Sequence, residues 1–318
     1  MRLVIRADAT RVTGTGHVMR SCVIAESAIA KGIETIFIGN IDGIEWLRVK
    51  VKNVGFSQIL NDISSYKLDE SEDVLVLDSY ENSDSWILNL NWLGKVVVVD
   101  PVSPNFQADL RFHPGLEDNW AINKELNFHG NGEFLLVRKE LREITRISKQ
   151  DKSLLEILIT GGGSDPYNFC SHISDVISSI NSTFSVSVIS DHYEVPINDS
   201  RFTVYPTGDS FVKLLPKIDL VFAPASTTCL EVLTLGLPLG IACVIENQES
   251  NYRKLVKEGA ALGIGHRNLD NSWDLDLEAL IDLINSKELR SKLVHQSLGK
   301  YDSLGSDRIV MKLIETYC

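Results

Sequence analysis

A histidine directly after a glycine-rich turn is the first residue of this chain that could do chemistry. Gly14 and Gly16 stand in the segment TGTGH, which ends at His17. Glycine permits a tight turn and a close approach of the backbone to a ligand. His17 then lies at the start of an expected helix, whose positive end favours the neutral imidazole that a general base needs. A glycine turn followed by a histidine that caps the helix would give the same pattern.

A carboxylate and a phenol follow the apolar run Val74–Leu77, at Asp78 and Tyr80. At the carboxyl end of a strand these two groups can orient a hydroxylated substrate. The alternative is an aspartate that caps the next helix with the tyrosine packed over it, and the pattern alone favours this alternative.

Amide side chains follow another apolar run, in the segment Glu246–Gln248. Asn247 and Gln248 suit the recognition of sugar hydroxyls or acetamido groups. N-capping of the next helix by Asn247 is the alternative.

Three consecutive glycines open the segment TGGGSDPYN, which follows an apolar run and precedes an expected helix. Backbone N–H groups in such a loop can hold phosphate oxygens. No GKS or GKT follows, so the segment is not a P-loop. We expect an anion site formed by Gly161, Gly162, Gly163, Ser164 and Asp165.

Hydroxyl side chains gather before a further expected helix, at Ser226, Thr227 and Thr228. Their hydroxyls and amides would point out of the helix N-terminus, where an anion is favoured. Glu231 lies one turn later and could accept both hydroxyls of a ribose. The alternative is a capping box, in which Thr228 and Glu231 each bond the other's backbone amide.

The other histidines and the cysteines show no spacing typical of a metal site. His113 stands in FHPG and could reach a ligand cleft, although we expect it on a surface turn. The five cysteines are scattered singly without a CxxC pair, which indicates reduced thiols rather than disulfides or structural zinc. These spacings predict no metal site at the histidines or cysteines, and we expect neither a metal nor a cofactor.

Short apolar runs alternate with amphipathic stretches along the chain, which is the rhythm of a doubly wound α/β fold. The near-continuous Val, Ile and Leu content of these runs suits strands buried on both faces, as in a parallel sheet. A repeat of small and apolar residues at helical spacing predicts a helix over Gly16–Ala30. The expected strands are Leu3–Arg6, Thr35–Ile38, Val74–Leu77, Val96–Val99, Phe134–Val137, Leu155–Ile159, Val186–Ile189, Phe202–Tyr205, Leu220–Ala223 and Leu239–Cys243.

This alternation predicts two α/β domains of similar length. A charge-dense segment, Lys139–Lys152, indicates a linker between them. We expect a Rossmann-like domain over residues 1–145, a second over 153–300, and a closing helix over 301–318. The second domain should contain helices at Pro166–Ile180, Ser210–Leu215, Thr228–Leu235 and Gln248–Glu258. In such folds ligands bind where strands lead into helices, and every candidate site lies at such a place.

The composition excludes several classes of protein. The chain has 318 residues, of which 44% are hydrophobic, and 31 Lys and Arg stand against 43 Asp and Glu. This excludes disorder and lacks the basic footprint of a nucleic-acid-binding protein. The N-terminus has no signal-peptide layout, and the longest apolar runs fall far short of the ~20 residues of a membrane span. We expect a cytoplasmic protein with neither a membrane span nor a nucleic-acid partner.

Taken in order along the chain, these loops resemble the PseG family. The matching segments are RADAT, GTGHVMR, DSY after VLVL, GGGSD, STTCLEVLTLGLP, ENQ and SLGSDRI. PseG enzymes are UDP-2,4-diacetamido-2,4,6-trideoxy-β-L-altropyranose hydrolases of pseudaminic acid biosynthesis, and GGGSD is shared with MurG-like glycosyltransferases. The resemblance implies a GT-B fold, in which two Rossmann-like doubly wound domains face a cleft and the final helix returns to the first domain.

The resemblance also implies a role for each matching residue. His17 would be the base that activates water, with inversion at the anomeric carbon and UDP as the leaving group. Tyr80 and Asn247 would position the sugar or the water. The other matching residues would bind substrate: Gly14, Gly16, Arg20, Asp78 and Gln248, with Gly161–Asp165 and Ser226–Thr228 at the diphosphate and Glu231 at the ribose.

On the sugar side the chain departs from that family, because DSY stands where the family has DHY. The expected function is hydrolysis of a nucleotide-activated diacetamido-trideoxy or related deoxyamino sugar for a surface polysaccharide. The alternative is a GT-B glycosyltransferase that uses a UDP-sugar or another nucleotide sugar in surface-glycan assembly. A third hypothesis is a nucleotide-sugar sensor without catalysis. The expected partner is a UDP-sugar, and an association with other sugar-biosynthesis enzymes stays open.

Overall fold

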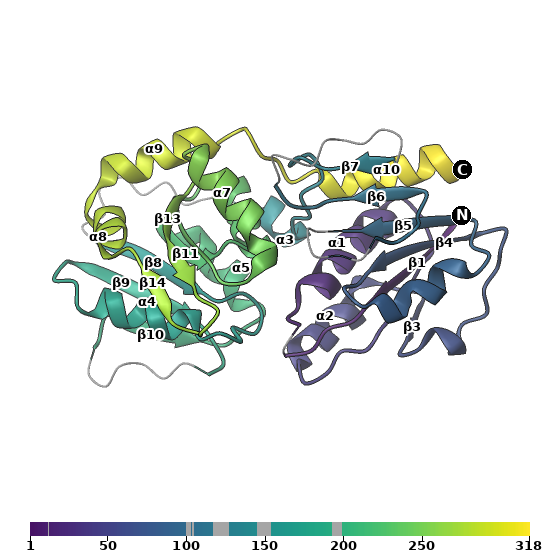
Figure 1. The fold of residues 1–318 in the computed structure, drawn as a ribbon, viewed down its shortest axis with the longest axis horizontal. Coiled ribbons are helices and arrows are strands. Elements are labelled where there is room, and N and C mark those ends of the chain that lie inside the picture. The colour runs from purple at the N-terminus through teal and green to yellow at the C-terminus, as the bar shows by residue number, and fades with distance from the viewer. Residues whose placement is uncertain (12, 100–102, 104, 117–126, 145–153, 193–198) are drawn as a thin grey trace. The chain divides into compact units, whose positions relative to one another are not determined.

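The chain divides into two compact units. Unit 1 comprises Met1–Lys139 and Asp302–Cys318, and unit 2 comprises Glu140–Tyr301. Figure 1 shows the ribbon of both units. The computed structural model describes residues 1–11, 13–99, 103, 105–116, 127–144, 154–192 and 199–318. Residues 145–152 of the expected linker lie outside the described residues, and its beginning forms helix α3 (Lys139–Arg142).

Unit 1 contains one sheet of seven parallel strands in the order β3-β2-β1-β4-β5-β6-β7. The chain builds this sheet outward from β1 to β3 and then returns to the other side of β1 with β4. This is the expected doubly wound pattern. The strands are β1 (Arg2–Ala7), β2 (Thr35–Ile38), β3 (Gln58–Leu60), β4 (Asp73–Asp78), β5 (Gly94–Val98), β6 (Leu110–Phe112) and β7 (Phe128–His129).

Alternate side chains of the central strands form a core on each face of this sheet. On one face Leu3 and Ile5 of β1 pack with Ile24 of α1 and Ile309 of α10. On the other face Val4 packs with side chains that follow β4. Both faces are therefore covered, which explains the near-continuous apolar content of β1 and β4. The helical elements are α1 (Gly16–Ala30), α2 (Glu45–Val54), η1 (Ile63–Ser65), η2 (Asn82–Asn89) and α10 (Gly305–Tyr317).

The prediction of a strand at Phe134–Val137 is wrong, because Phe134 lies in a turn and the residues after it form no strand and pair with no described strand. Its backbone lies against the start of α10 instead. A Cβ atom on Gly305 would lie 2.2 Å from the Leu135 carbonyl oxygen and 2.5 Å from its nitrogen. The segment still contributes Phe134 to the core that contains α1 and α10. Its apolar pattern therefore reflects packing under α10, not pairing in the sheet.

Unit 2 repeats the same topology with the strand order β10-β9-β8-β11-β12-β13-β14. All pairs are parallel except that of β13 with β14, which is antiparallel. The chain again builds outward from the first strand and then switches sides. The strands are β8 (Leu155–Thr160), β9 (Phe184–Ile189), β10 (Phe202–Tyr205), β11 (Leu220–Pro224), β12 (Leu239–Cys243), β13 (Leu262–Arg267) and β14 (Trp273–Leu275).

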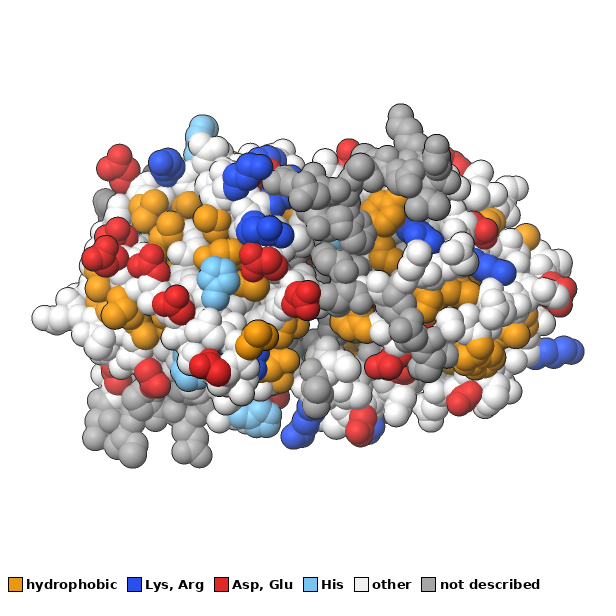
Figure 2. All heavy atoms as spheres, in the orientation of Figure 1, with side chains coloured by type: hydrophobic (Ala, Val, Ile, Leu, Met, Phe, Trp, Pro, Cys, Tyr) orange, Lys and Arg blue, Asp and Glu red, His pale blue; other side chains and the backbone are white. Residues whose placement is uncertain are grey.

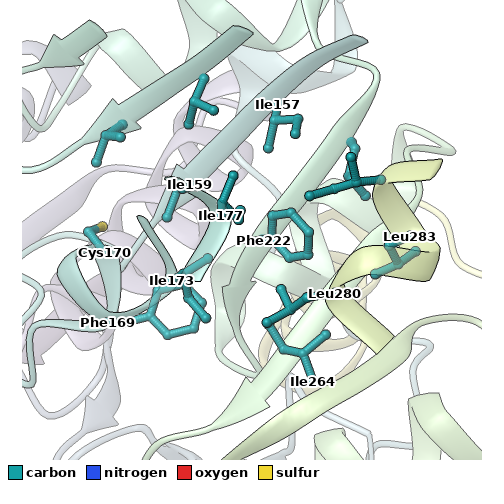
Figure 3. Close-up of a cluster of buried hydrophobic side chains, with 14 of the residues drawn as sticks. Ile157, Ile159, Phe169, Cys170, Ile173, Ile177, Phe222, Ile264, Leu280 and Leu283 are labelled. Carbon is teal, nitrogen blue, oxygen red and sulfur yellow. The ribbon is translucent and has the colours of Figure 1, made fainter. Parts of the chain in front are cut away.

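A single large cluster forms the core on one face of the second sheet. Figure 3 shows Phe222 of β11 among side chains that come from α4 and α8, including Ile177 and Leu280. Full burial of a Phe, Leu or Ile side chain contributes about 1.5–3 kcal/mol each, so these residues dominate the stability of the unit. The helical elements of unit 2 are α4 (Phe169–Ser178), α5 (Ser210–Leu214), η4 (Leu215–Lys217), α6 (Thr227–Thr234), η5 (Glu246–Gln248), α7 (Glu249–Lys257), α8 (Leu277–Asn285) and α9 (Lys287–Ser297).

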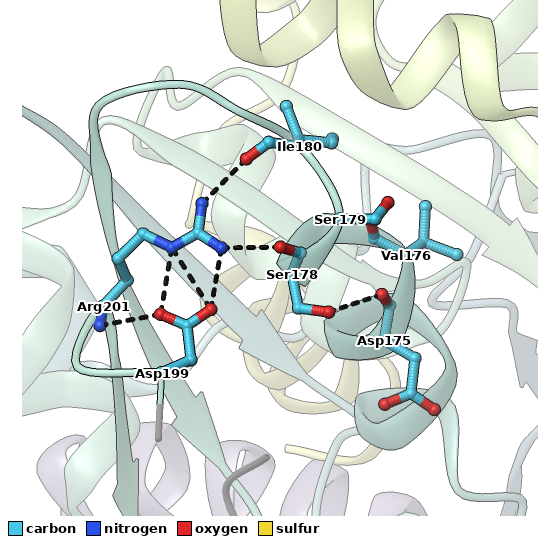
Figure 4. Close-up of polar contacts among 7 residues, drawn as sticks. All are labelled: Asp175, Val176, Ser178, Ser179, Ile180, Asp199 and Arg201. Carbon is cyan, nitrogen blue, oxygen red and sulfur yellow. Dashed lines mark hydrogen bonds and ion pairs between the residues drawn. The ribbon is translucent and has the colours of Figure 1, made fainter. Parts of the chain in front are cut away.

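Arg201, directly before the edge strand β10, anchors that strand to the end of α4. Its guanidinium donates to the carbonyl oxygens of Ser178 at 2.6 Å and Ile180 at 2.8 Å, and forms an ion pair with Asp199 at 2.7 Å (Figure 4). The carbonyls at a helix C-terminus have no partner inside the helix, so a cation there is favourable. Arg201 thus links the end of α4 to the start of β10.

Charged and apolar side chains are mixed on the molecular surface drawn in Figure 2. Among the described residues on that face, Lys and Arg groups stand beside acidic groups and form no continuous basic field. None of the described helices has both the length and the apolar character needed to cross a membrane.

Candidate active site

Each unit places candidate residues at the point where the strand order of the sheet reverses, whereas Asn247 and Gln248 follow β12, one strand further along. In unit 1 this point lies between β1 and β4, and in unit 2 between β8 and β11. Loops that leave two such strands run in opposite directions, which opens a crevice at the carboxyl ends of the strands. His17 follows β1 and Asp78 ends β4, while the glycine loop follows β8 and Ser226 follows β11.

The glycine turn before His17 adopts the backbone conformation that glycine permits. Gly14 has a φ of +81°, and its amide donates to the Thr10 carbonyl oxygen at 2.9 Å. Gly16 is the first residue of α1, and a Cβ atom there would meet no described atom within 4 Å. The turn conformation therefore requires Gly14, whereas packing among the described residues does not require Gly16.

The His17 ring is bonded to a buried carboxylate. Its Nδ1 lies 2.5 Å from Oδ1 of Asp78, and the two residues are only 5% and 1% exposed. Contact at this distance requires a proton between the two atoms, since a bare nitrogen would set one lone pair against another. Nδ1 therefore bears the hydrogen, and Nε2 of the neutral ring is free to accept a proton. This is the tautomer that a general base uses.

Arg20 binds the same carboxylate from the next turn of α1. Its Nε donates to Oδ2 of Asp78 at 2.9 Å and its Nη2 to Oδ1 at 2.7 Å. Burial acts to raise the pKa of Asp78, but the charge of Arg20 and the hydrogen bonds from His17 and Arg20 outweigh it and lower the pKa. Asp78 is therefore a carboxylate whose two oxygens are both engaged, and it does not cap the next helix. The expected role of Asp78 and Arg20 in binding substrate stays a prediction.

Tyr80 packs edge-on against the His17 ring. The two ring centroids are 4.1 Å apart with an angle of 80° between the ring planes. This T-shaped contact and the bond to Asp78 fix the imidazole from two sides. The sequence placed His17, Asp78 and Tyr80 in two separate loops, and the structure brings all three together.

His113 is a residue of this cluster that the sequence misplaced. The surface-turn prediction is wrong, because His113 directly follows β6 and is only 2% exposed. Burial and the positive charge of Arg20 lower its pKa from 6.5 to about 4. His113 is therefore uncharged at neutral pH. Its position directly after Leu110 and Phe112, which alternate with Arg111 as in a short strand, is the signal that could have identified it.

The two expected anion loops of unit 2 are neighbours. Gly162 has a φ of +89°, and a Cβ atom on it would lie 3.9 Å from Oγ1 of Thr228. The amide of Gly162 donates to the Thr160 hydroxyl at 3.3 Å, which shapes the turn. Gly163 and Ser164 continue this loop. The glycine loop and the start of α6 thus form one surface at the switch point of unit 2.

Asp165 has a structural role at the start of α4. Its carboxylate accepts the backbone amides of Phe169 at 2.8 Å and Cys170 at 3.0 Å. A Cβ atom on Gly161 would lie 2.2 Å from the Asp165 carboxyl carbon, so this contact requires glycine at position 161. The negative charge of Asp165 therefore occupies the α4 N-terminus, where a phosphate would otherwise be favoured.

The capping-box alternative for Thr228 and Glu231 does not fit the observed helix. Helix α6 begins at Thr227 with Ser226 as its N-cap, so Thr228 lies inside the first turn. The Ser226 hydroxyl makes no capping bond to the described amides of α6. Glu231 is 4% exposed. The hydroxyls at this N-terminus are therefore not used for a capping box.

The amides after β12 shape their own loop. The Gln248 side-chain oxygen accepts the Val244 amide at 3.0 Å, and Asn247 lies inside η5, whose N-cap is Ile245. The N-cap of the following helix α7 is Gln248, so N-capping by Asn247 is not observed. Asn251, which the sequence did not single out, donates to the Ala225 carbonyl oxygen at 3.1 Å. This bond ties α7 to the loop after β11.

Four of the five cysteines are buried, and Cys318 is exposed. Burial raises the pKa of Cys170 and Cys229 far above neutral pH, and that of Cys243 to about 12. A protonated thiol is a weak nucleophile and a poor metal ligand. Within the described part of the chain, no group of three or more His, Cys, Asp or Glu side chains is arranged to hold a metal ion.

Curated relatives share the sequence only in part. No protein-family model matches the chain. An uncharacterized protein of Methanocaldococcus jannaschii is 24% identical over 347 aligned residues, which cover 95% of this chain and 71% of that protein. A UDP-N-acetylglucosamine–N-acetylmuramyl-(pentapeptide) pyrophosphoryl-undecaprenol N-acetylglucosamine transferase of Oenococcus oeni is 30% identical over 151 residues, which cover 42% of this chain and 38% of the transferase.

Solved structures match the chain over almost its full length. Acinetobacter baumannii MurG superposes on this chain with a TM-score of 0.65 at 15% sequence identity. The superposition covers 99% of this chain and 100% of the MurG chain. S. aureus MnaA in complex with UDP superposes with a TM-score of 0.66 at 12% identity, with 100% of this chain and 98% of its own matched. The fold is GT-B. At these identities the likeness shows the fold alone.

Proposed function

We propose that this chain is a glycosyltransferase that moves a sugar from a nucleotide-activated donor to a hydroxyl acceptor. The observation that carries this proposal is the 2.5 Å contact between His17 Nδ1 and Asp78 Oδ1 at the switch point of unit 1. It leaves Nε2 of a neutral imidazole as a proton acceptor, which is the group that a hydroxyl nucleophile needs. The GT-B fold, shared with MurG and MnaA, supports a nucleotide sugar as the donor.

The proposed reaction is a single displacement at the anomeric carbon. The acceptor oxygen forms a bond to this carbon, and its proton passes to Nε2 of His17. The bond from the anomeric carbon to the diphosphate oxygen breaks, and its electron pair leaves with the nucleoside diphosphate. Attack opposite the leaving group inverts the anomeric configuration. Asp78 stabilises the charged ring while it holds the proton, as the carboxylate of a catalytic triad does.

The diphosphate is assigned to the loops of unit 2. Asp165 occupies the N-terminus of α4, so we assign the phosphates to the amides of the glycine loop and of the α6 N-terminus, beside Ser226 and Thr228. Such amides and a helix dipole stabilise the negative charge that develops on the leaving diphosphate. Glu231 is assigned to the ribose. Tyr80 and Asn247 are assigned to the sugar, as the sequence predicts.

The choice of transfer over hydrolysis is supported by the N-acetylglucosamine transferase of Oenococcus oeni, which is 30% identical over 151 residues. Hydrolysis is the second candidate. The segments RADAT and GTGHVMR support it, because they resemble the PseG hydrolases. In that case water is the nucleophile and the products are the nucleoside diphosphate and the free deoxyamino sugar, with the same base and the same leaving group.

Mass spectrometry of the products decides between these candidates. The full-length chain would be incubated with a panel of UDP-, GDP- and CMP-sugars, with and without glycan acceptors. Transfer predicts a glycoside with an acceptor present and negligible free sugar without one. Free sugar at the same rate in both conditions would establish hydrolysis instead. Binding without any product across the panel would contradict both candidates.

A further inference from the structure

We propose that Arg20 is a positioning residue that keeps the His17 ring uncharged by sharing the Asp78 carboxylate with it. The inference rests on the proposed function only for the use of this ring as a base. The arrangement of charges itself lies wholly within unit 1. It differs from the sequence expectation, in which Arg20 binds substrate.

The shared carboxylate is the first observation. Oδ1 of Asp78 accepts from His17 Nδ1 at 2.5 Å and from Arg20 Nη2 at 2.7 Å, while Oδ2 accepts from Arg20 Nε at 2.9 Å. A carboxylate facing an imidazole alone would strongly favour the protonated ring. Here the guanidinium of Arg20 binds both oxygens of Asp78 and offsets the charge of the carboxylate. The carboxylate therefore attracts a second cation, the protonated His17 ring, less strongly.

The position of the guanidinium relative to the ring is the second observation. Nη2 of Arg20 lies 3.0 Å from Nδ1 of His17. Since Nδ1 bears a hydrogen, this is a close approach of two donors. Protonation at Nε2 would put a positive ring directly beside a positive guanidinium. The three side chains are each less than a tenth exposed, so water and salt screen this repulsion poorly.

The other titratable groups around the ring do not replace this effect. Tyr80, from the loop after β4, meets the ring edge-on and is neutral as a phenol. His113, after β6, is buried and senses the charge of Arg20, and its pKa of about 4 leaves it uncharged at neutral pH. The charges described next to His17 are thus Asp78 on β4 and Arg20 on α1 itself.

Two substitutions separate the charge of Arg20 from its shape. Arg20→Gln removes the charge, so the carboxylate of Asp78 is left to the ring alone. Arg20→Lys keeps the charge but loses the bidentate geometry. Arg48→Gln is the matched control, because Arg48 is an arginine of unit 1 that binds the Ile41 carbonyl oxygen, outside this cluster.

The test is a pH titration of the His17 ring by NMR, in the full-length chain labelled with ¹⁵N-histidine and without substrate. The wild-type ring is expected to carry its hydrogen on Nδ1 when neutral. Arg20→Gln should take up the second proton at a pH about one unit higher, a roughly tenfold stronger affinity for the proton. Arg20→Lys and Arg48→Gln should titrate near the wild type. The proposal would be overturned if the His17 ring in Arg20→Gln took up its second proton at the same pH as in the wild type or at a lower pH.

The titration needs no turnover, so its result is independent of whether nucleotide sugars are the substrates. Should Arg20→Gln not fold, two other results would overturn the proposal. One is a neutral wild-type His17 ring that carries its hydrogen on Nε2. The other is a His17 ring that takes up its second proton at least one pH unit higher in Arg20→Lys than in the wild type. With an active substrate in hand, the acidic limb of kcat/KM should move upward in Arg20→Gln by the same amount. A raised KM with an unmoved pH profile would instead assign Arg20 to substrate binding.

Discussion

At the level of single residues, the pair His17 and Asp78 carries the proposed chemistry. This chemistry requires the tautomer in which the hydrogen of the His17 ring is on Nδ1. Asp78→Asn replaces an acceptor with an amide that can donate to Nδ1, so the ring hydrogen moves to Nε2 and the base is lost. We expect kcat/KM to fall about 10²–10⁴-fold, the usual contribution of a general base. UDP affinity, measured by calorimetry, should not change.

The matched control for this substitution is Asp42→Asn, on an exposed loop residue of unit 1. It should leave kcat/KM unchanged. A kcat/KM for Asp78→Asn within threefold of the wild type would contradict the assigned tautomer.

A second residue-level prediction concerns stability against pH. The unfolded chain protonates His113 near 6.5, whereas burial and Arg20 delay protonation in the folded chain to about 4. The stabilisation of the folded chain by neutral His113 is therefore complete above pH 6.5 and is lost as the pH falls towards 4. Lowering the pH from 7 to 5 should for this reason reduce the free energy of unfolding by about 2 kcal/mol.

Urea unfolding of the wild type and of His113→Gln at pH 7 and pH 5 measures this contribution. The wild type should lose about 2 kcal/mol more than the variant over this interval. An equal loss in both proteins would show that His113 is not held neutral by its surroundings.

The sequence predicted some of these residues better than others. His17 and the glycine loops were visible because their residue types follow apolar runs directly. The partnership of Asp78 with Arg20 was not, because it joins the end of β4 to the second turn of α1, 58 residues apart. His113 was misplaced because Pro and Gly follow it and suggest a surface turn. Burial at that site depends on tertiary packing, which local sequence does not report.

At the level of elements, the central strands were predictable and the edges were not. Strands such as β1, β4, β8 and β11 are buried on both faces, so their continuous apolar runs are long and clear. The strands that sequence analysis missed are β3, β6, β7, β13 and β14, which are short, polar or interrupted by glycine. The segment Phe134–Val137 has a strand-like pattern, but its partner is a helix.

The contact between α4 and β10 gives the prediction at this level. Arg201→Ala removes the hydrogen bonds to the carbonyl oxygens of Ser178 at the end of α4 and of Ile180 just after it, and the ion pair with Asp199. Because this side chain is partly exposed, we expect the free energy of unfolding of unit 2 to fall by only about 1–2 kcal/mol. Urea titration followed by circular dichroism measures the change.

Lys213→Ala is the matched control, since Lys213 pairs with Asp209 on an exposed helix face. Such exposed pairs contribute little, so the control should unfold like the wild type. A change in Arg201→Ala no larger than in this control would contradict the anchoring role of Arg201.

At the level of the whole molecule, the GT-B fold gives each unit its own switch point, and the two switch points are chemically different. The one in unit 1 has a carboxylate-bound imidazole, and the one in unit 2 has glycine and hydroxyl-bearing loops. The strand rhythm predicted two doubly wound α/β domains, and the resemblance to the PseG family implied the GT-B arrangement. Under the proposed function, side chains at these switch points select the sugar and the acceptor, and residue types alone do not identify either.

The most direct measurement is the release of nucleoside diphosphate by the full-length chain, with the donor identified from the product panel. His17→Ala is compared with His295→Ala, a matched control on the exposed face of α9. We predict that His17→Ala lowers kcat at least about hundredfold while the affinity for UDP is retained, and that His295→Ala turns over like the wild type. Full turnover by His17→Ala would contradict the account.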